Sequence, residues 1–399
     1  MTQTISIGNL VGENGQIVSP INLPASIFTK HCAVFGASGS GKTGQILGMV
    51  EENIINGIPT ILIDIKGDMS NIMLQDDLEM QAQIDFRLLT PGADHGEQIN
   101  IFAGLSKPDR LSNSVSSLLK MIGENYDPIQ SNMHAFLSKL LEWMQEKKHE
   151  CNLENIIRFT LEPPFTSFGA LELDAAVPQR RRMSLAAKLN TVLVAPSFTM
   201  WREGIILNVD ELFARPDPSR TKVTVYSVAH LVDEGERNFA IALLLDEVLS
   251  WIRTQEGHDK LRACLVVDEC VGIIPPYPAN PPSKRPLMLL LKQARAFGLG
   301  LILASQNTKD LDYKALSNCE TWLIGRLTMK RDQDRVIEGL LSNSSLPKNI
   351  LEDRINSLKA RYFLMVRPGE VARIYSNEVS CELKGPMTPF ELAKLYKGL

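Results

Sequence analysis

The most restrictive feature of the sequence is a glycine-rich segment near its amino end. Residues 36–43 read GASGSGKT and match the pattern GxxxxGK[ST] in full. The apolar run His31–Phe35 before the segment predicts a strand, and the run Lys42–Asn56 after it predicts a helix, which is the context that the pattern requires. The segment therefore indicates a loop that binds the phosphate chain of a nucleotide, with a chance match of a Gly/Ser-rich turn as the alternative.

The residue types of this loop account for the predicted chemistry. Glycines let the backbone turn tightly so that its N–H groups face a phosphate chain, and the start of the following helix adds a partial positive charge. Lys42 is predicted to reach the β- and γ-phosphates of ATP, and the Thr43 hydroxyl to bind Mg²⁺. The nucleotide-binding residues predicted in this segment are Gly36, Ala37, Ser38, Gly39, Ser40, Gly41, Lys42, Thr43 and Gly44.

Beyond this segment, short apolar runs alternate with helical patterns along most of the chain. That rhythm predicts an α/β fold with a mainly parallel sheet. The last two runs flank Pro368-Gly369-Glu370, which is typical of the turn of a β-hairpin. The predicted strands besides His31–Phe35 are Ile58–Ile65, Phe86–Thr90, Ile99–Phe102, Lys222–Val228, Ala263–Val267, Leu299–Ala304, Thr321–Leu327, Arg361–Arg367 and Val371–Ser376.

The middle of the chain departs from this rhythm, because helical patterns such as Leu111–Met121 and Ala135–Met144 replace the apolar strands. We therefore predict a mostly helical insertion at 106–221, within an ATPase core formed by 31–105 and 222–399. Residues 1–30 form a separate N-terminal segment. The proline-rich stretch Pro275–Pro286 is predicted to be a loop, because proline is poorly tolerated in helices and central strands.

Two adjacent acids after a buried strand are predicted to complete the site. Ala263–Val267 leads directly to Asp268 and Glu269. Unpaired buried carboxylates are strongly disfavoured, so the pair indicates a site for a cation, with a helix cap as the alternative. We expect Asp268 to hold Mg²⁺, directly or through water, and Glu269 to be the base that activates the attacking water. Gln306 follows the next strand and is a candidate γ-phosphate sensor, or else an ordinary strand-end amide.

A further charged segment, Asp64-Ile65-Lys66-Gly67-Asp68, follows the second predicted core strand. Strand ends on this side of a parallel sheet face the ligand crevice. Asp64 and Lys66 are therefore predicted either to pair with each other or to line the nucleotide site. A charged turn closed by Gly67 is an equally good interpretation.

Composition narrows the range of functions. The chain has 42 Lys and Arg against 46 Asp and Glu, a formal net charge of −4, which excludes a protein that coats nucleic acid through its global charge. The six cysteines form no CxxC pair, so reduced thiols are expected rather than a disulfide framework or a zinc site. No signal peptide and no apolar run long enough for a membrane segment is visible, and we expect a soluble, cytoplasmic protein.

Five segments in combination resemble the HerA/FtsK superfamily of P-loop ATPases, most of all the bacterial HerA-like ATP-binding proteins of the domain-of-unknown-function 87 type. They are GASGSGKT, LIDIKGD, LVVDE, LKQARAFGLGLILASQN and LDYKALSNCETWLIGRL. The resemblance implies a RecA-like core, a homo-oligomeric and usually hexameric ring, and ATP-driven translocation on double-stranded DNA. It also implies work with a nuclease or another effector protein, in DNA end processing or in phage defence.

The resemblance also implies roles for particular arginines. Conjugative coupling ATPases of the superfamily carry an arginine finger, which acts on the neighbouring subunit, eleven residues before the sensor glutamine. Arg295 stands eleven residues before Gln306 and is the corresponding candidate, with an exposed helical arginine as the alternative. Arg326, at a strand end, is a second candidate for phosphate contact. Residues 1–30 are too few for the N-terminal β-barrel of HerA proper, and we expect the helical insertion or the C-terminal hairpin to take its place in ring closure and partner docking.

DNA contacts are predicted in the loop that follows the Asp-Glu strand, because this loop faces the ring channel in FtsK-like motors. Lys284 and Arg285 lie in it and suit phosphate contacts that carry no sequence information. A rigid loop for packing between subunits is the alternative. A second cationic patch, Arg180-Arg181-Arg182, is interpreted as the solvated start of a helix or as part of a surface stripe with Lys147 and Lys148.

Three functions are compatible with these features. The first is a ring motor that translocates or remodels duplex DNA with an effector partner. The second is a nucleotide-dependent scaffold that assembles a partner enzyme without long-range movement. The third is a motor for protein substrates. All three use the same hydrolytic site, so Lys42, Asp268 and Glu269 are central to each.

Overall fold

The computed structural model of the protein describes residues 3–106, 110–306, 308–340 and 347–398. The chain divides into two compact units, which are described separately below. Unit 1 comprises Met1–Leu89 and Val209–Leu399, and unit 2 comprises Thr90–Asn208. The bounds of unit 2 differ from the predicted insertion at 106–221, because α8 (Val209–Phe213) packs on β8 of unit 1.

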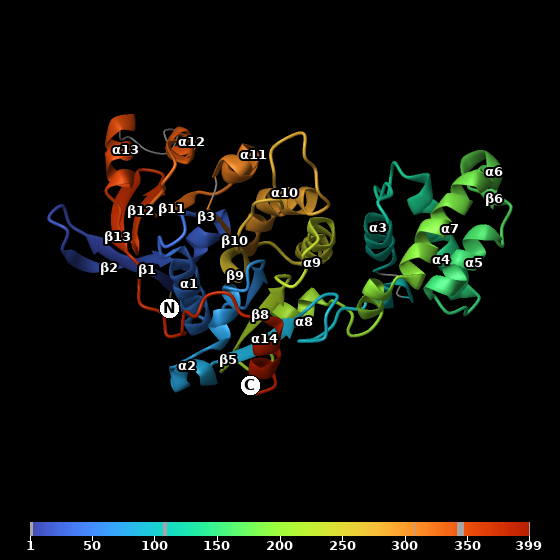
Figure 1. Ribbon diagram of the computed structural model, residues 1–399, viewed down its shortest axis with the longest axis horizontal. Helices are drawn as coiled ribbons and strands as arrows, with labels where there is room; N and C mark the ends of the chain where they lie inside the picture. The colour runs from blue at the N-terminus through green and yellow to red at the C-terminus, as the bar shows by residue number, and fades with distance from the viewer. Residues whose placement is uncertain (1–2, 107–109, 307, 341–346, 399) are drawn as a thin grey trace. The chain divides into compact units, whose positions relative to one another are not determined.

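Unit 1 is built on one large mixed sheet, shown in Figure 1. Among the described residues the sheet has eleven strands in the order β2-β1-β13-β12-β11-β3-β10-β9-β4-β8-β5. The strands from β11 to β5 are parallel to one another, whereas β12, β13, β1 and β2 continue the sheet in antiparallel register. The predicted α/β fold with a mainly parallel sheet is thus confirmed.

The strands of this sheet are β1 Thr4–Val11, β2 Ile17–Pro24, β3 Cys32–Phe35, β4 Thr60–Asp64, β5 Ile84–Leu89, β8 Thr221–Ser227, β9 His258–Val267, β10 Phe297–Ser305, β11 Thr321–Ile324, β12 Tyr362–Arg367 and β13 Glu370–Tyr375. The helices of unit 1 besides α8 are α1 Lys42–Ile55, α2 Leu78–Ala82, α9 Glu234–Thr254, α10 Lys284–Gln293, α11 Tyr313–Leu316, α12 Lys330–Leu340, α13 Lys348–Asn356 and α14 Pro389–Tyr396. Short 3-10 helices are η1 Ala25–Lys30, η2 Met69–Met73, η6 Ala294–Ala296 and η7 Thr308–Asp310.

Helices cover both faces of the parallel strands. Val50 of α1 belongs to the same buried cluster as Val34 and Leu62, which places α1 on one face. Tyr226 points to the other face, where its hydroxyl donates a hydrogen bond to the carbonyl of Ala240 in α9 at 2.6 Å. Strands that are buried on both faces consist of continuous apolar residues, so the apolar runs of the sequence predicted these strands.

The two ends of unit 1 meet at the antiparallel side of the sheet. Asn9 pairs with Tyr375 and Leu10 pairs with Ile374, so the β1–β2 hairpin extends the sheet beyond the C-terminal hairpin β12–β13. The predicted C-terminal hairpin is present, and it belongs to the main sheet. Residues 1–30, which were predicted to form a separate N-terminal segment, therefore contribute two strands to the same sheet.

Two local predictions were wrong. Ile99–Phe102 is not a strand: Ile99 forms only an isolated bridge with Ile205. The stretch Pro275–Pro286 is not a loop throughout, because α10 begins at Lys284. Pro286 is tolerated there since the first turn of a helix lacks intrahelical partners for its N–H groups.

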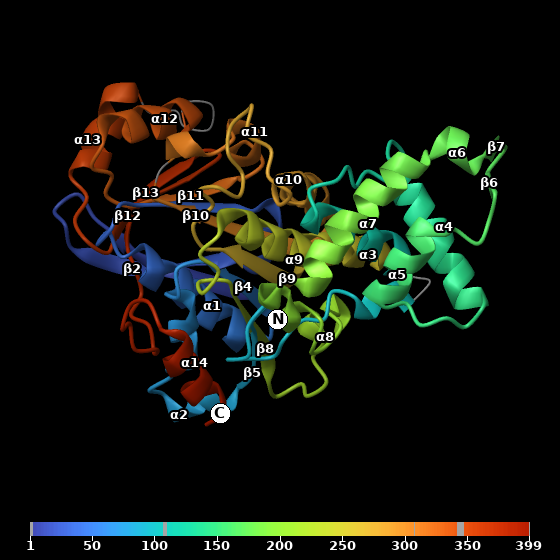
Figure 2. The ribbon, with the colours of Figure 1, turned by 45° about the vertical axis from the view of Figure 1, so that its right-hand side comes forward.

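Unit 2 is helical and has its own core. Its elements are η3 Ala103–Ser106, α3 Leu111–Met121, α4 Asn132–Glu146, α5 Leu153–Leu161, β6 Ser167–Phe168, β7 Leu171–Glu172, α6 Leu173–Ala176, α7 Gln179–Val194 and η5 Pro196–Trp201. Leu118, Phe136, Ile156 and Leu189 bring α3, α4, α5 and α7 into one buried cluster. Figure 2 shows these helices in green. No helix in the described part of the chain is long and apolar enough to cross a membrane.

Candidate active site

The glycine-rich loop joins β3 to α1 at the carboxyl edge of the sheet. Gly39 and Gly41 have φ values of 73° and 91°, a left-handed conformation that glycine adopts without strain. A Cβ atom on Gly41 would lie 3.1 Å from the backbone nitrogen of Arg361, and that nitrogen donates a hydrogen bond to the Ser40 carbonyl at 2.8 Å. The chain just before β12 therefore braces the loop from outside. No sequence pattern indicates this role of Arg361, because its contact is long-range and made by the backbone.

Two polar atoms of the loop and one carboxylate oxygen lie buried without a hydrogen-bond partner. These atoms are Ser40 Oγ, Lys42 Nζ and Asp268 Oδ2. Leaving a buried polar group unpaired costs about 1–3 kcal/mol, so such groups need a reason in a folded protein. A donor-rich loop beside a buried ammonium that makes no hydrogen bond fits a phosphate chain, and the carboxylate oxygen without a hydrogen bond fits a cation beside it.

Asp268 follows β9 directly and is 2% exposed. Burial raises its pKa to about 7, although the charge of Lys42 opposes the change. A divalent cation can offset the same desolvation cost by taking the place of the proton. The described residues contain no group of three or more His, Cys, Asp or Glu able to hold a metal. Mg²⁺ commonly binds through one or two protein ligands together with phosphate oxygens and water, and Asp268 with the Thr43 hydroxyl suits that pattern.

Glu269 is the most heavily contacted acid of the site. Its φ of 65° is left-handed, which is rare for a residue other than glycine. Its Oε1 accepts hydrogen bonds from the Ser305 hydroxyl at 2.9 Å and from the Gln306 N–H at 3.4 Å. Its Oε2 lies 2.7 Å from Lys66 Nζ and 3.6 Å from Lys42 Nζ. Burial alone would raise the pKa of Glu269, but the charges of Lys42 and Lys66 and these hydrogen bonds lower it.

The structure separates Asp64 from Lys66. Asp64 is fully buried, and its carboxylate accepts hydrogen bonds from the Gly67 N–H at 2.7 Å and the Ser70 N–H at 2.8 Å. It thus closes its own turn, as the structural interpretation proposed. Lys66 instead reaches Glu269. The predicted pairing of Asp64 with Lys66 is wrong, because Asp64 binds the backbone of its own turn and Lys66 binds Glu269.

Gln306 and Arg326 both lie beside the loop. A cavity of about 160 Å³ is lined by Ala37, Ser38 and Gln306 together with residues 327–329 and 332. The Arg326 carbonyl accepts a hydrogen bond from the Ala37 N–H at 2.9 Å. Gly44 lies in the first turn of α1, where a Cβ atom would touch Leu383 of the C-terminal segment at 3.4 Å. Lys42, Asp268, Glu269, Gln306 and Arg326 are thus brought to one edge of the sheet. Ser305, which contacts Glu269, was missed although it directly precedes Gln306 at the end of the same predicted strand.

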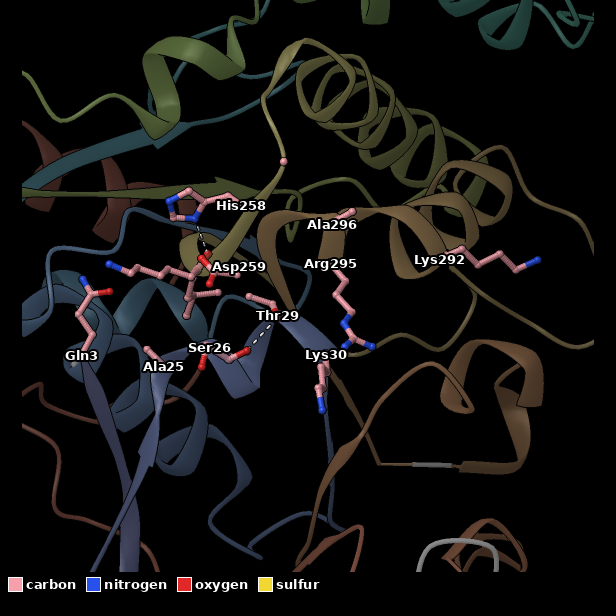
Figure 3. Close-up of a pocket in the computed structure, with 13 residues that line it drawn as sticks. Gln3, Ala25, Ser26, Thr29, Lys30, His258, Asp259, Lys292, Arg295 and Ala296 are labelled. Carbon is pink, nitrogen blue, oxygen red and sulfur yellow. Dashed lines mark hydrogen bonds between the residues drawn. The ribbon is translucent and has the colours of Figure 1, made fainter.

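Arg295 lies away from this edge. It belongs to η6, at the start of β10, whereas the other end of β10 reaches Glu269 through Ser305. A nine-residue strand spans about 30 Å, which separates Arg295 from its own chain's loop. Arg295 lines a groove of about 1490 Å³ together with Lys30, Lys260 and Lys292. Figure 3 shows Arg295, Lys30 and Lys292 around this groove.

The predicted DNA contact at Lys284 is contradicted by its surroundings. Its side chain is only 12% exposed, and its ammonium lies 2.9 Å from Asp312 Oδ2 and donates to the Pro275 carbonyl at 2.6 Å. Lys284 therefore holds the proline-rich segment to neighbouring residues of the same chain. Arg285 is exposed on the first turn of α10.

Two arginines of the patch Arg180-Arg181-Arg182 in unit 2 form ion pairs with acidic residues. Arg182 is 6% exposed and pairs with Asp174 at 2.6 Å, while Arg181 lies 3.7 Å from Glu124. These contacts hold the start of α7 and do not form a continuous cationic stripe. The interpretation of a helix start fits this segment better.

Comparisons with known proteins agree with this architecture. The family model described as "Helicase HerA, central domain" matches residues 5–191. The chain is 22% identical over 370 residues to the DNA double-strand break repair helicase HerA of Pyrococcus furiosus, covering 88% of this chain and 65% of that protein. It is 22% identical over 352 residues to HerA of Saccharolobus solfataricus, covering 87% and 63%. The chain thus spans less than two thirds of the length of these relatives.

Solved structures show the same fold. VirB4 of Thermoanaerobacter pseudethanolicus matches with a TM-score of 0.63 at 14% identity, covering 98% of both chains. The plasmid coupling protein TrwB in complex with ADP and Mg²⁺ matches with a TM-score of 0.60 at 14% identity, covering 97% of both. The family model over residues 5–191, the relatives at 22% identity, the common fold and the glycine-rich loop lead to one conclusion: the chain is similar to HerA-type P-loop ATPases and shares the fold of VirB4 and TrwB.

Proposed function

We propose that this protein is the subunit of an ATP-hydrolysing ring motor that moves along or remodels double-stranded DNA in the cytoplasm. One observation carries the hydrolytic part of the proposal. Lys42 Nζ and Asp268 Oδ2 are buried without hydrogen-bond partners beside the glycine-rich loop, and Glu269 lies next to both. A buried ammonium and a buried carboxylate oxygen that make no hydrogen bond, together with a neighbouring acid, suit the hydrolysis of a nucleoside triphosphate.

Each residue has a role in this proposal. The N–H groups of the loop and Lys42 bind the phosphate chain, while Thr43 and Asp268 would hold Mg²⁺. When bound, the ion would offset the negative charge of the phosphates. Glu269 accepts a proton from the attacking water and orients it. The Ser305 hydroxyl and the Gln306 N–H hold the Glu269 carboxylate in position for this step.

A ring explains the position of Arg295. An arginine at the far end of β10 is useful for phosphoryl chemistry only if another subunit presents its nucleotide there. We therefore propose a homo-oligomer, a hexamer in keeping with the superfamily, in which the groove around Arg295 receives the loop edge of the next subunit.

Duplex DNA is the proposed substrate. The names of the two archaeal relatives, which are helicases of DNA double-strand break repair, support it. Arg285 is the proposed residue for phosphate contact in the channel, because it is exposed whereas Lys284 is largely buried. A nuclease or another effector protein is the proposed partner, in DNA end processing or phage defence.

The Glu269→Gln variant tests the hydrolytic site. It keeps the shape of the side chain but removes the base, so kcat for ATP hydrolysis should fall by about 10²- to 10⁴-fold. Binding of ATP should persist. The measurement is steady-state phosphate release alongside titration with a fluorescent ATP analogue. The control, Lys42→Ala, should lose binding as well as turnover. Wild-type turnover by Glu269→Gln would show that the base has been assigned to the wrong residue.

A further inference from the structure

We propose that Lys66 is a positioning residue with two exchangeable partners, the Glu269 carboxylate and the terminal phosphate of a nucleoside triphosphate. In this account Lys66 releases Glu269 when a third phosphate enters, so that the base becomes available only for a triphosphate. The inference rests on the proposed function, because it takes Glu269 as the base. Beyond the proposed function, a residue outside the glycine-rich loop would distinguish a nucleoside triphosphate from a diphosphate.

The first step concerns the contacts of Glu269. Lys66 and Lys42 approach Oε2 at 2.7 Å and 3.6 Å, while Ser305 and the Gln306 N–H approach Oε1 at 2.9 Å and 3.4 Å. A carboxylate has about four lone-pair sites, so this arrangement occupies both of its oxygens. A base must accept a hydrogen bond from the water that it activates. The departure of one of these donors would free an oxygen of Glu269 for this water.

The second step identifies the donor that can leave. Ser305 is fully buried at the end of β10, and the N–H of Gln306 belongs to the backbone that follows it. The Gln306 N–H cannot withdraw without moving the backbone, and the short side chain of Ser305 is enclosed by the surrounding core. Lys66 has a flexible four-carbon stem, and its side chain is 33% exposed. Lys66 can therefore exchange partners by rotation of its side chain alone.

The third step concerns the backbone that carries Lys66. The Asp64 carboxylate accepts hydrogen bonds from Gly67 and Ser70 and so fixes the turn around Lys66. The Met387 N–H donates to the Gly67 carbonyl at 3.2 Å, which holds the same turn from the C-terminal segment. Because the backbone is held at both ends, the movement is confined to the lysine side chain and does not require a loop to open.

The fourth step identifies the alternative partner. Lys42 and Lys66 contact the same oxygen of Glu269, so both ammonium groups lie at the position to which the motif directs the β- and γ-phosphates. A terminal phosphate offers several charged acceptor oxygens and competes well with one carboxylate oxygen. A nucleoside diphosphate lacks the terminal phosphate, so its last phosphate group lies next to Lys42. Lys66 then keeps its ion pair with Glu269.

The test compares Lys66→Met with the parent protein, using the full chain, Mg²⁺, ADP and a non-hydrolysable ATP analogue. A hydrogen bond between charged groups corresponds to about a tenfold change in affinity or more. Lys66→Met should therefore bind the triphosphate analogue at least about tenfold more weakly, with ADP affinity changed less than about twofold. In ATP hydrolysis, KM should rise by a similar factor with little change in kcat, since the lost contact exists in both ground and transition states. Lys66→Arg should restore most of the discrimination.

Controls separate this inference from other effects. Lys188→Met removes a lysine that pairs with Glu124 in unit 2, and it should leave both affinities unchanged. Retained ADP binding reports a folded loop, and Lys66→Gln provides a second neutral variant if Lys66→Met does not fold. An unchanged ratio of triphosphate to diphosphate affinity, or an equal loss of both, would overturn the role of Lys66. Failure of the proposed function is distinguishable, because it appears as normal turnover by Glu269→Gln.

Discussion

At the scale of single residues, Gly41 joins the local sequence pattern to a distant contact. Its φ of 91° is left-handed, and a Cβ atom would meet Arg361 backbone atoms at 3.1–3.2 Å. Gly41→Ala should therefore add strain of about 1–2 kcal/mol and push the loop away from Arg361. We expect the affinity for ATP to fall by about tenfold or more, measured by titration with a fluorescent ATP analogue.

The matched control is Gly369→Ala. Gly369 is also left-handed, at φ 75°, but no atom lies within 4 Å of a Cβ atom placed there. This variant should lose stability without losing nucleotide affinity. If both variants bind ATP equally well, the loop does not depend on the brace at Arg361.

The motif residues could be predicted because their chemistry is encoded locally. Lys42 lies within an eight-residue pattern, and Asp268 and Glu269 follow a strand whose carboxyl end had to face the same edge. The ion pair of Lys284 could not be predicted, because its partner Asp312 lies in a different part of the sequence. No local pattern around Lys284 indicates this contact.

At the scale of elements, Glu51 of α1 fastens the C-terminal segment. It is 5% exposed, and its carboxylate accepts hydrogen bonds from the N–H groups of Ser380 at 2.9 Å and Cys381 at 3.1 Å. Glu51→Ala should lower the free energy of unfolding by about 2–3 kcal/mol, because buried N–H groups lose their acceptor. Urea denaturation measures this change. The exposed Glu378 is the control, and its replacement by Ala should cost less than about 0.5 kcal/mol. Equal effects of the two variants would contradict this account of the segment.

Strands and helices were predicted well where the pattern of apolar residues is clear, and poorly where a strand pairs with a segment far away in the sequence. The buried parallel strands appeared as apolar runs, whereas the pairing of β1 with β13 joins opposite ends of the chain and leaves no local pattern. Ile99–Phe102 has the composition of a strand, but Ile99 makes only a single bridge. Tertiary context decides such short segments.

At the scale of the whole molecule, the position of Arg295 predicts sharing of active sites between subunits. Arg295→Ala should reduce ATP turnover by about 10³-fold or more if the arginine acts as a finger. Lys42→Ala should be inactive for a different reason. Mixed rings of the two variants should regain turnover, because an intact loop on one subunit can meet an intact arginine on the next. A mixture as inactive as its parents would argue against a shared site.

The net charge of the whole chain says little about whether the protein binds DNA. The value of −4 excludes a general coat for nucleic acid, but a ring motor needs only a few exposed cations facing its channel. Lys284 is engaged internally, and the exposed Arg285 is the cation of that segment that we propose faces the channel.

The central claim is that ATP hydrolysis by this protein is coupled to duplex DNA. The most direct measurement is the rate of phosphate release by the purified full chain as linear duplex DNA is added, with Lys42→Ala as the inactive reference. The proposed motor predicts that DNA raises turnover several-fold in a saturable manner, and that rising salt abolishes the increase as phosphate contacts are screened. Turnover that stays the same at every DNA concentration would contradict the claim.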